Sequence, residues 1–255
     1  MKIALAAPLL TLDQREINQT RMMEALVQAK DAGADLVLFS EAALSGFESM
    51  NFDYRHDIVR ALGLNGPELA VFREQASALN IGIGLGFYEN EEGGIYDSYL
   101  IMDREGQNLH LYRRLSPTWM DAGACADYRV GHDLQPFHFE GKAFATVLCG
   151  DLWTDNLLTA FSILDDQVDC WLWPVHVDFS LETWQNPSTD RSDPTLCNEY
   201  AYCHQASLFA HPVCFVNTYV PNPGRAKGGL YVWQQGQTLA QAPMGRPGLL
   251  LFELD

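Results

Sequence analysis

Three side chains that could act together on an electrophilic carbon stand just after apolar segments of this chain. Cys149 follows the apolar run at residues 143–148, and an ionised cysteine is a strong nucleophile. Glu41 follows the run at residues 36–39, and a carboxylate partly withdrawn from water can accept a proton from a thiol. Arg114 carries a permanent charge that can stabilise an oxyanion. These residue types predict nucleophilic attack by Cys149, with Glu41 as base and Arg114 as the stabilising cation.

Each of these residues also has an ordinary structural explanation. A single cysteine among apolar residues usually fills a core, and a glutamate at the end of a strand is usually exposed. Arg113 and Arg114 are adjacent, and such pairs usually lie in solvent. The catalytic interpretation therefore requires a fold that brings Glu41, Arg114 and Cys149 together.

The elements that would position these residues are short apolar runs bounded by turn residues, alternating with helical patterns. The runs predict buried strands at residues 3–7, 36–39, 81–87, 99–102, 143–148, 170–173 and 213–216. Apolar residues at helical spacing predict helices at residues 16–32, 67–79, 156–164 and 195–210. Continuous apolar strands alternating with amphipathic helices indicate sheets covered by helices, an α/β or α+β fold in layers.

Glycines refine this picture in two places. Gly82, Gly84 and Gly86 alternate within one predicted strand, which favours close packing between layers over dinucleotide binding. The last part of the chain, residues 229–254, has the apolar runs and the glycine turn at Gly236 that predict a β-meander. No internal repeat is present.

Composition predicts one large domain, residues 1–255. The chain has 255 residues, 47% of them apolar, and no linker or low-complexity run divides it. Asp and Glu number 33 against 16 Lys and Arg, which gives a net charge of -17. A charge of that sign repels phosphate backbones and anionic lipids, so it predicts neither a nucleic-acid nor a membrane partner.

The opening residues and the cysteines predict a cytoplasmic protein. Residues 1–10 are followed at once by charged residues and by no small-residue cleavage site, so they predict a first strand and not a signal peptide. The six cysteines include no Cys-x-x-Cys pair, and four of them lie among apolar or aromatic residues, which suits reduced thiols. No stretch approaches the ~20 apolar residues of a membrane span.

The chain resembles the nitrilase, or carbon–nitrogen hydrolase, superfamily over nearly its whole length. The matching segments are residues 33–41 with Gly46-Phe47, residues 96–106 leading to Tyr112-Arg113-Arg114, the segment Cys149-Gly-Asp-Leu-Trp153, residues 213–217 and the hairpins from Gly228 onward. The resemblance implies a four-layer αββα sandwich that pairs into a homodimer or higher homo-oligomer. It also implies a Glu-Lys-Cys triad, in which Glu41 and Cys149 match the base and the nucleophile.

This sequence departs from the family in its cation and in its second active-site glutamate. Arg114 replaces the lysine of the family's Tyr-Arg-Lys motif; it keeps the charge but cannot release a proton at working pH. If Glu41 and Arg114 serve the nucleophile, Cys149 is expected to titrate below a free thiol. Lys142 begins the strand that Cys149 follows, so it is not expected at the site. Where the family has the second glutamate, Asp121 or Asp127 is at best a partial substitute.

The resemblance also points to residues around the substrate. Gly150 would lend its backbone N–H to an oxyanion hole. Trp153 makes the nucleophile segment similar to the Cys-Glu-Asp-x-Trp form of glutaminase domains. Trp119 and His176 are predicted to contact substrate, with an ordinary buried histidine as the alternative for His176.

Two functions are compatible with these observations. The first is a thiol-dependent hydrolase of a small amide, carbamoyl or nitrile compound, acting through a thioester at Cys149. The second is a nitrilase-fold binding or interaction protein with weakened or lost catalysis, favoured by Arg114 and by the missing glutamate. Neither a cofactor nor a metal is predicted, because the residues that could be drawn into a zinc site match no common zinc spacing: Cys197, Cys203, His204 and His211.

Overall fold

Two six-stranded sheets form the centre of the computed structural model, which describes residues 1–190, 197–222 and 225–255. The first sheet has the order β14-β1-β2-β3-β4-β5 and consists of β14 (Gly248–Glu253), β1 (Lys2–Ala7), β2 (Leu36–Leu38), β3 (Gly82–Glu91), β4 (Gly94–Met102) and β5 (Asn108–Arg113). The second has the order β13-β12-β9-β8-β7-β6 and consists of β13 (Gln237–Ala242), β12 (Leu230–Gln234), β9 (Val213–Asn217), β8 (Cys170–Val175), β7 (Lys142–Thr146) and β6 (Phe137–Phe139).

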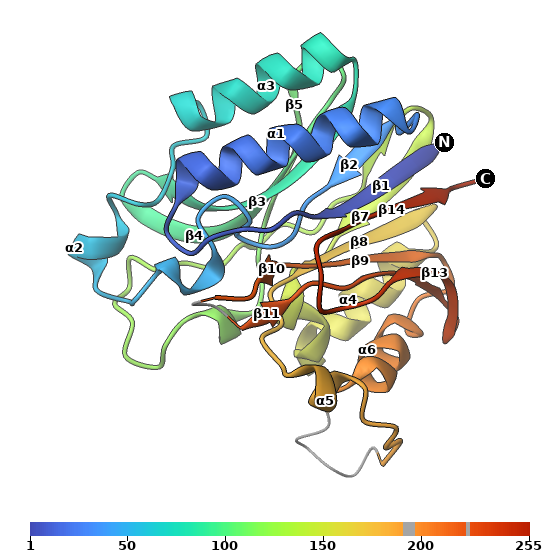
Figure 1. Ribbon diagram of the computed structural model, residues 1–255. Coiled ribbons are helices and arrows are strands. Elements are labelled where there is room, and N and C mark those ends of the chain that lie inside the picture. The colour runs from blue at the N-terminus through green and yellow to red at the C-terminus, as the bar shows by residue number, and fades with distance from the viewer. Residues whose placement is uncertain (191–196, 223–224) are drawn as a thin grey trace.

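Helices cover the outer face of each sheet (Figure 1). Helices α1 (Arg15–Asp31) and α3 (Pro67–Leu79) lie over the first sheet, and α4 (Asp155–Asp165) and α6 (Glu199–Ala206) lie over the second. The short helices are α2 (Tyr54–Asp57), α5 (Leu181–Trp184), η1 (Phe47–Ser49), η2 (Pro117–Trp119) and η3 (Cys149–Trp153), and a small ribbon pairs β10 (Tyr219–Val220) with β11 (Ala226–Lys227). The predicted four-layer αββα sandwich is therefore confirmed.

Three apolar cores hold the four layers together. One lies between the first sheet and its helices, with Met22, Leu26 and Phe72 packed on strand residues. A second lies between the sheets and includes Tyr99 and Tyr112. The third, between the second sheet and its helices, is rich in aromatic side chains: Trp171, Trp173, Trp184, Phe215 and Trp233. Because strands in both sheets are covered on two faces, they read in sequence as continuous apolar runs.

The alternating glycines of β3 pack closely against their neighbours, as predicted. A Cβ at Gly82 would lie 2.6 Å from the ring of Phe139, on the facing sheet. A Cβ at Gly86 would lie 2.4 Å from the carbonyl oxygen of Ser40 and 2.8 Å from the Cα of Glu41. Only glycine at position 86 lets the loop after β2 lie directly on β3.

Two predicted elements differ from the structure. Strands β12 and β13 form a hairpin, but β14 leaves it and pairs antiparallel with β1 in the other sheet, so the predicted meander is wrong in its last strand. The helix predicted at residues 195–210 is shorter: α6 spans Glu199–Ala206, residues 195–196 lie outside the described residues, and residues 207–210 are turn. Apolar residues after the helix belong to the core and not to a further turn: Phe209 stacks on Trp171 at 4.1 Å.

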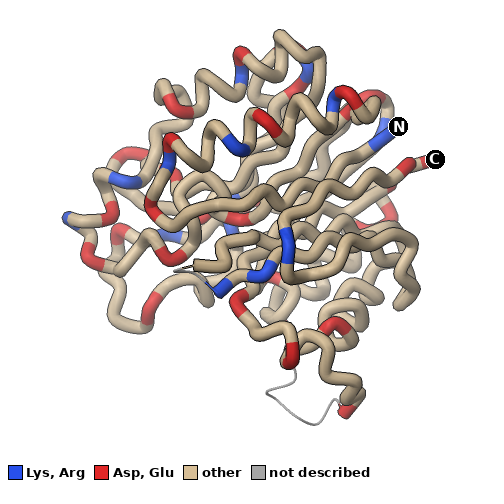
Figure 2. Tube along the Cα trace, in the orientation of Figure 1, with Lys and Arg blue, Asp and Glu red and all other residues tan. Residues whose placement is uncertain are grey.

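Acidic residues are spread over all four layers (Figure 2). In the whole chain, 33 acidic residues stand against 16 basic residues. Among the described residues, none of the helices has the length and apolar content needed to cross a bilayer.

Candidate active site

Cys149 stands at a sharp turn between β7 and η3. Its φ is +36°, in a region that residues with a side chain rarely adopt, whereas Leu148 before it is extended. The segment before the turn is tied to the sheet, since the Val147 N–H donates to the Leu172 carbonyl at 3.0 Å. A backbone conformation of this cost persists only where the surroundings hold it, and such positions concentrate at functional sites.

Asp151 holds this turn in place. Its buried carboxylate accepts from the Tyr112 hydroxyl at 2.6 Å and from the Leu148 N–H at 2.9 Å. Its other oxygen accepts from the N–H groups of Leu115, at 3.1 Å, and Ser116, at 2.7 Å. One side chain thus joins the nucleophile turn to the segment that follows β5 and carries Arg114.

Glu41 lies in the loop after β2 and is completely buried. The close approach to Gly86 positions the loop from one side, and Thr218 holds it from the other by donating to the Ser40 hydroxyl at 2.8 Å. One carboxylate oxygen accepts from Arg114 Nη1 at 2.8 Å, and the other accepts from the His176 N–H at 2.6 Å. Both oxygens of Glu41 therefore have a donor within the protein.

Arg114 follows β5 and is 3% exposed. Its Nε donates to the Ser116 hydroxyl at 2.9 Å, and its Nη2 donates to the Thr118 hydroxyl at 2.8 Å. Nη1 donates to Glu41 and, at 3.4 Å, to Asp97 Oδ2. The guanidinium is therefore fixed by four side chains, a geometry that the single ammonium of a lysine could not reproduce.

Asp97, on β4, is a second buried carboxyl group at the site that the sequence reasoning missed. It is 1% exposed, and its Oδ1 has no hydrogen-bond donor facing it. Its backbone carbonyl also accepts from the Arg114 N–H at 2.8 Å, so β4 and the segment after β5 hold the two side chains together. The feature of the sequence that could have revealed Asp97 is its position next to Tyr96, within the segment at residues 96–106 that resembles the family.

Burial and the neighbouring charges set the protonation of this cluster. Burial raises the pKa of the Cys149 thiol, the Glu41 charge raises it further, and the Arg114 charge opposes both. The expectation of an acidic thiol is therefore wrong, because burial of the sulfur and the Glu41 charge together outweigh the Arg114 charge. Burial is the largest single influence on Arg114 and opposes its charge, but the negative groups around it, Glu41 first among them, together outweigh burial, so the pKa of Arg114 is raised and the cation is permanent. A protonated thiol beside Glu41 requires that carboxylate as its base.

Gly150 lies directly against the guanidinium. A Cβ at this position would be 2.3 Å from Arg114 Nη2 and 2.4 Å from the Thr118 hydroxyl oxygen. The glycine after the nucleophile thus provides the space that Arg114 occupies. Arg114, which replaces the family's lysine, is therefore in contact with the residue that follows the nucleophile.

The other predicted site residues lie at different distances from the nucleophile. His176 is close: its carbonyl lies 3.8 Å from Cys149 Sγ, and its buried ring stacks on Phe47. Its Nε2 lies 3.4 Å from Glu48 Oε2, and its Nδ1 has no hydrogen bond. Trp119 is buried in an aromatic cluster with Tyr88, and its indole N–H also has no partner. Trp153 is 44% exposed. Its ring packs edge-to-face against the ring of Tyr202, with the ring centroids 5.2 Å apart.

The structure does not bring the remaining candidates to the site. Within the described ranges, no hydrogen bond or ion pair joins Asp121 or Asp127 to Glu41, and Asp121 is exposed. Lys142 lies at the far end of β7, where it contacts Asp255 and Asp169, as predicted. In the described part of the chain, no group of three or more His, Cys, Asp or Glu side chains is arranged to hold a metal ion.

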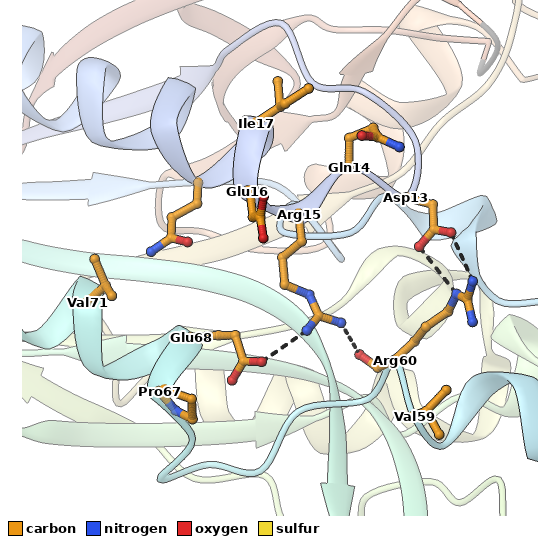
Figure 3. Close-up of a pocket in the computed structure, with 11 residues that line it drawn as sticks. Asp13, Gln14, Arg15, Glu16, Ile17, Val59, Arg60, Pro67, Glu68 and Val71 are labelled. Carbon is orange, nitrogen blue, oxygen red and sulfur yellow. Dashed lines mark hydrogen bonds and ion pairs between the residues drawn. The ribbon is translucent and has the colours of Figure 1, made fainter.

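A surface hollow of about 720 Å³ lies apart from this cluster, between α1, α3 and the segment after α2 (Figure 3). Two ion pairs cross it, from Arg15 to Glu68 at 3.1 Å and from Arg60 to Asp13 at 3.1 Å. Its lining includes no cysteine, serine or histidine. The hollow therefore lacks a nucleophile, and the buried Cys149 cluster is the candidate active site.

A strained cysteine, a buried glutamate and a fixed cation lie together in this αββα sandwich, and they form its candidate active site. The carbon–nitrogen hydrolase family model matches residues 3–188, so the chain belongs to the carbon–nitrogen hydrolase family. This match bears out the resemblance noted from the sequence.

Known relatives include synthetases, nitrilases and amidases. The chain is 27% identical over 166 residues to the glutamine-dependent NAD(+) synthetase of Acinetobacter baylyi, covering 64% of this chain and 29% of the synthetase. It is 30% identical over 111 residues to the arylacetone-specific nitrilase of Alcaligenes faecalis, covering 40% of this chain and 31% of the nitrilase. The matches thus span less than a third of either relative's length.

A solved structure of similar architecture is an amidase from Nesterenkonia sp. AN1. It aligns with a TM-score of 0.75 and 15% identity, covering 100% of this chain and 93% of the amidase. That amidase carries acrylamide added to its active-site cysteine. At this level of identity the likeness supports the fold alone.

Proposed function

We propose that this protein hydrolyses a non-peptide C–N bond in a small amide, carbamoyl or nitrile compound through a thioester at Cys149. The observation that carries the proposal is the placement of Cys149 beside Glu41 and Arg114 at a strained turn. Glu41 takes the thiol proton, and the sulfur attacks the substrate carbon. The Arg114 cation stabilises the negative oxygen of the tetrahedral intermediate.

Collapse of that intermediate completes the first half of the reaction. Protonated Glu41 returns its proton to the departing nitrogen, so an amide releases ammonia or an amine and leaves the acyl group on Cys149. Water then attacks the thioester with Glu41 again as base, and the acid and the thiol are regenerated. Gly150, Trp119 and His176 are proposed to line the substrate; Trp119 Nε1 and His176 Nδ1 are buried and have no hydrogen-bond partner in the protein, so they are available to bond it.

Glutamine is the first substrate to test. The synthetase relatives are glutamine-dependent, and the amidase of similar fold carries acrylamide, a small amide, at its active-site cysteine. Release of ammonia should be measured with glutamine, simple aliphatic amides, carbamoyl compounds and nitriles. Cys149→Ser should abolish turnover, whereas Cys125→Ser, at an exposed cysteine, should leave it unchanged.

Trapping of the acyl-enzyme distinguishes hydrolysis from binding alone. Mass spectrometry of the Cys149 peptide during turnover should detect the acyl adduct, and hydroxylamine should release it. Turnover that persists in Cys149→Ser would contradict the proposal. A protein that binds these compounds, turns over none of them and shows no adduct would instead be a binding protein of this fold.

We also propose that residues 1–255 act as one hydrolase domain, that it pairs with a second copy, and that it works in the cytoplasm. Strands β1 and β14 support the first point, because the two ends of the chain pair within one sheet. The cysteine pattern supports the last, because the six cysteines include no Cys-x-x-Cys pair and four lie among apolar or aromatic residues, which suits reduced thiols.

The proposed pairing surface is an apolar hollow of about 350 Å³ on α4 and the segment after α6. Ile163 is 66% exposed and Leu208 is 45% exposed beside it. Such a patch indicates a protein contact. Light scattering should detect a dimer that Ile163→Glu weakens; Val59→Glu, at a residue 73% exposed on the opposite helix layer, is the matched control. A monomeric wild type would contradict the pairing.

A further inference from the structure

Two buried carboxyl groups share one cation at the centre of the site. Arg114 Nη1 lies 2.8 Å from Glu41 Oε1 and 3.4 Å from Asp97 Oδ2, and the side chains of Glu41 and Asp97 are both fully buried. If both buried groups were ionised, the single guanidinium would leave one negative charge unbalanced and shielded from solvent. Burial of such a charge costs free energy. A proton held by one of them would remove that charge.

Hydrogen bonding identifies the carboxyl group that holds the proton. Glu41 has a donor on each oxygen, Arg114 on one and the His176 N–H on the other, which suits an ionised carboxylate. Asp97 has one long contact to Arg114, and its Oδ1 faces no donor. An ionised Asp97 would leave that oxygen unsatisfied, whereas a protonated Asp97 can donate to Glu41.

We propose that Asp97 is a positioning residue that holds a proton between itself and Glu41 and so keeps the cluster of Glu41, Asp97 and Arg114 electrically neutral. This inference rests on the proposed hydrolase function, because its effect on turnover acts through Glu41 and Cys149. When the thiol proton passes to Glu41, the neutral cluster becomes positive and faces the new Cys149 thiolate. The negative charge on the sulfur is therefore balanced, whereas an ionised Asp97 would leave it unbalanced. The Asp97 proton stays in place throughout, so no additional donor or acceptor is consumed.

The electrostatic surroundings of Asp97 support this assignment. Burial raises the pKa of Asp97 well above its ordinary value, the charge of Glu41 and the hydrogen bond to it raise it further, and Arg114 opposes them. The titratable and charged groups that face Asp97 or its partners come from six places: Glu41, Tyr88 on β3, Tyr112 on β5, Arg114, Cys149 with Asp151, and Tyr202 on α6. Arg114 is the one cation among these groups.

Asp97 can set the net charge of the cluster through its own proton, which Arg114 cannot do. Arginine cannot release or accept a proton at working pH, so it cannot take any proton-handling role that a lysine has. Asp97 places a titratable group on the same guanidinium nitrogen that holds Glu41.

The test compares the wild type with Asp97→Asn, which mimics the protonated carboxyl in shape and keeps a donor toward Glu41. Infrared difference spectra of the two proteins at neutral pH should contain the carbonyl band of one protonated carboxylic acid, present in the wild type alone. Activity of Asp97→Asn should stay within about tenfold of the wild type, well short of the 10²–10⁴-fold contribution of a general base. Asp165→Asn, at a buried aspartate that bonds Trp171, is the matched control.

The pH profile supplies the readout that a purely structural role would not change. Wild-type turnover should fall at high pH as Asp97 ionises and the cluster becomes negative, and this basic limb should move upward or vanish in Asp97→Asn. No lost carboxylic-acid band, together with a basic limb unchanged in position, would overturn the proposal. Should Asp97→Asn fail to fold, Asp97→Ser serves in both measurements.

The infrared result does not depend on turnover, which separates the two proposals. A band lost in Asp97→Asn while Cys149→Ser still turns over substrate would uphold the Asp97 assignment and overturn the thioester mechanism. Thioester chemistry at Cys149 without that band would do the reverse.

Discussion

The two faces of β5 carry adjacent arginines with different roles. Arg113 points to the outer side, where it forms a two-pronged pair with buried Glu89 at 2.8 and 2.7 Å and stacks on Tyr96 at 4.3 Å. Arg114 points between the sheets, where its partner is buried Glu41. Both are arginine–glutamate pairs with a fully buried carboxylate, yet the arginine side chains are 22% and 3% exposed.

The difference lies in what surrounds each pair. Arg113 bonds carboxylates alone, including Glu91 at 2.6 Å, and water reaches it, so the pair stabilises the sheet edge. Arg114 shares its nitrogens with hydroxyl groups and lies beside a thiol, in a region where charges are screened weakly. Successive residues of an extended chain face opposite sides, so a shift of one position separates an ion pair at the sheet edge from the ion pair that we propose to be catalytic.

The largest difference between the two pairs should appear when their glutamates lose their charge. Glu41→Gln removes the base and should lower kcat by about 10³–10⁴-fold, because the Cys149 thiol is protonated in the resting protein. Glu89→Gln should leave kcat unchanged and lower stability by about 1 kcal/mol. Steady-state rates and urea unfolding of both variants make the comparison; similar rate losses would show that the two pairs do not differ in function.

Substitution of each arginine by lysine should have the next largest effect. Arg114→Lys keeps the charge but loses the fork that binds Ser116, Thr118 and Glu41 together, so kcat should fall by about 10³-fold, the upper range for a lost oxyanion donor. Arg113→Lys should change kcat less than twofold. A rise in turnover of Arg114→Lys would mean instead that arginine is an impaired replacement for the family's lysine.

Much of the fold and of the triad could be predicted from the sequence, because both depend on local pattern. Buried strands appear as apolar runs, and Glu41, Arg114 and Cys149 each follow one. The partner of β14 could not be predicted, because pairing of strands far apart in the chain depends on contacts that no local pattern specifies.

The charge environment of the site was equally hidden in the sequence. Asp97 lies in a segment that reads as part of a strand, and only the fold places its side chain beside Glu41 and Arg114. The direction of the Cys149 pKa shift also depended on depth and distance, which residue types alone do not give. The resemblance to the family predicted which residues meet, and the structure indicated how their charges affect one another.

A histidine on the inner face of β5, His110, should make the stability of the protein depend on pH. His110 lies on that face, stacked on Phe137 at 4.8 Å, and burial lowers its pKa from 6.5 to about 4. As pH falls below 6.5 the unfolded chain binds a proton first, so about 3 kcal/mol of stability present above that pH is lost by pH 4. Urea unfolding at pH 7 and pH 4.5 should show the loss in the wild type.

Substitution identifies the source of that pH dependence. His110→Leu should flatten it between these two pH values, and His138→Leu, at an exposed histidine on β6, should not. An equal pH dependence in His110→Leu and the wild type would mean that other groups on the sheet cause it.

The smallest expected effect tests whether Gly150 and Arg114 depend on each other. Gly150→Ala places a Cβ 2.3 Å from Arg114 Nη2, so the guanidinium must move by a fraction of an ångström, and kcat should fall about tenfold. Gly123→Ala, where a Cβ would meet nothing within 4 Å, should have no effect.

A double-mutant cycle isolates the contact itself. In the Arg114→Lys background the Nη2 atom is gone, so Gly150→Ala should cost much less than it does in the wild type, with only the Thr118 hydroxyl left to yield. Equal costs in the two backgrounds would mean that Gly150 acts through the backbone of the nucleophile turn. A coupled result would instead mean that arginine can serve as the cation of this site only because the residue after the nucleophile has no side chain.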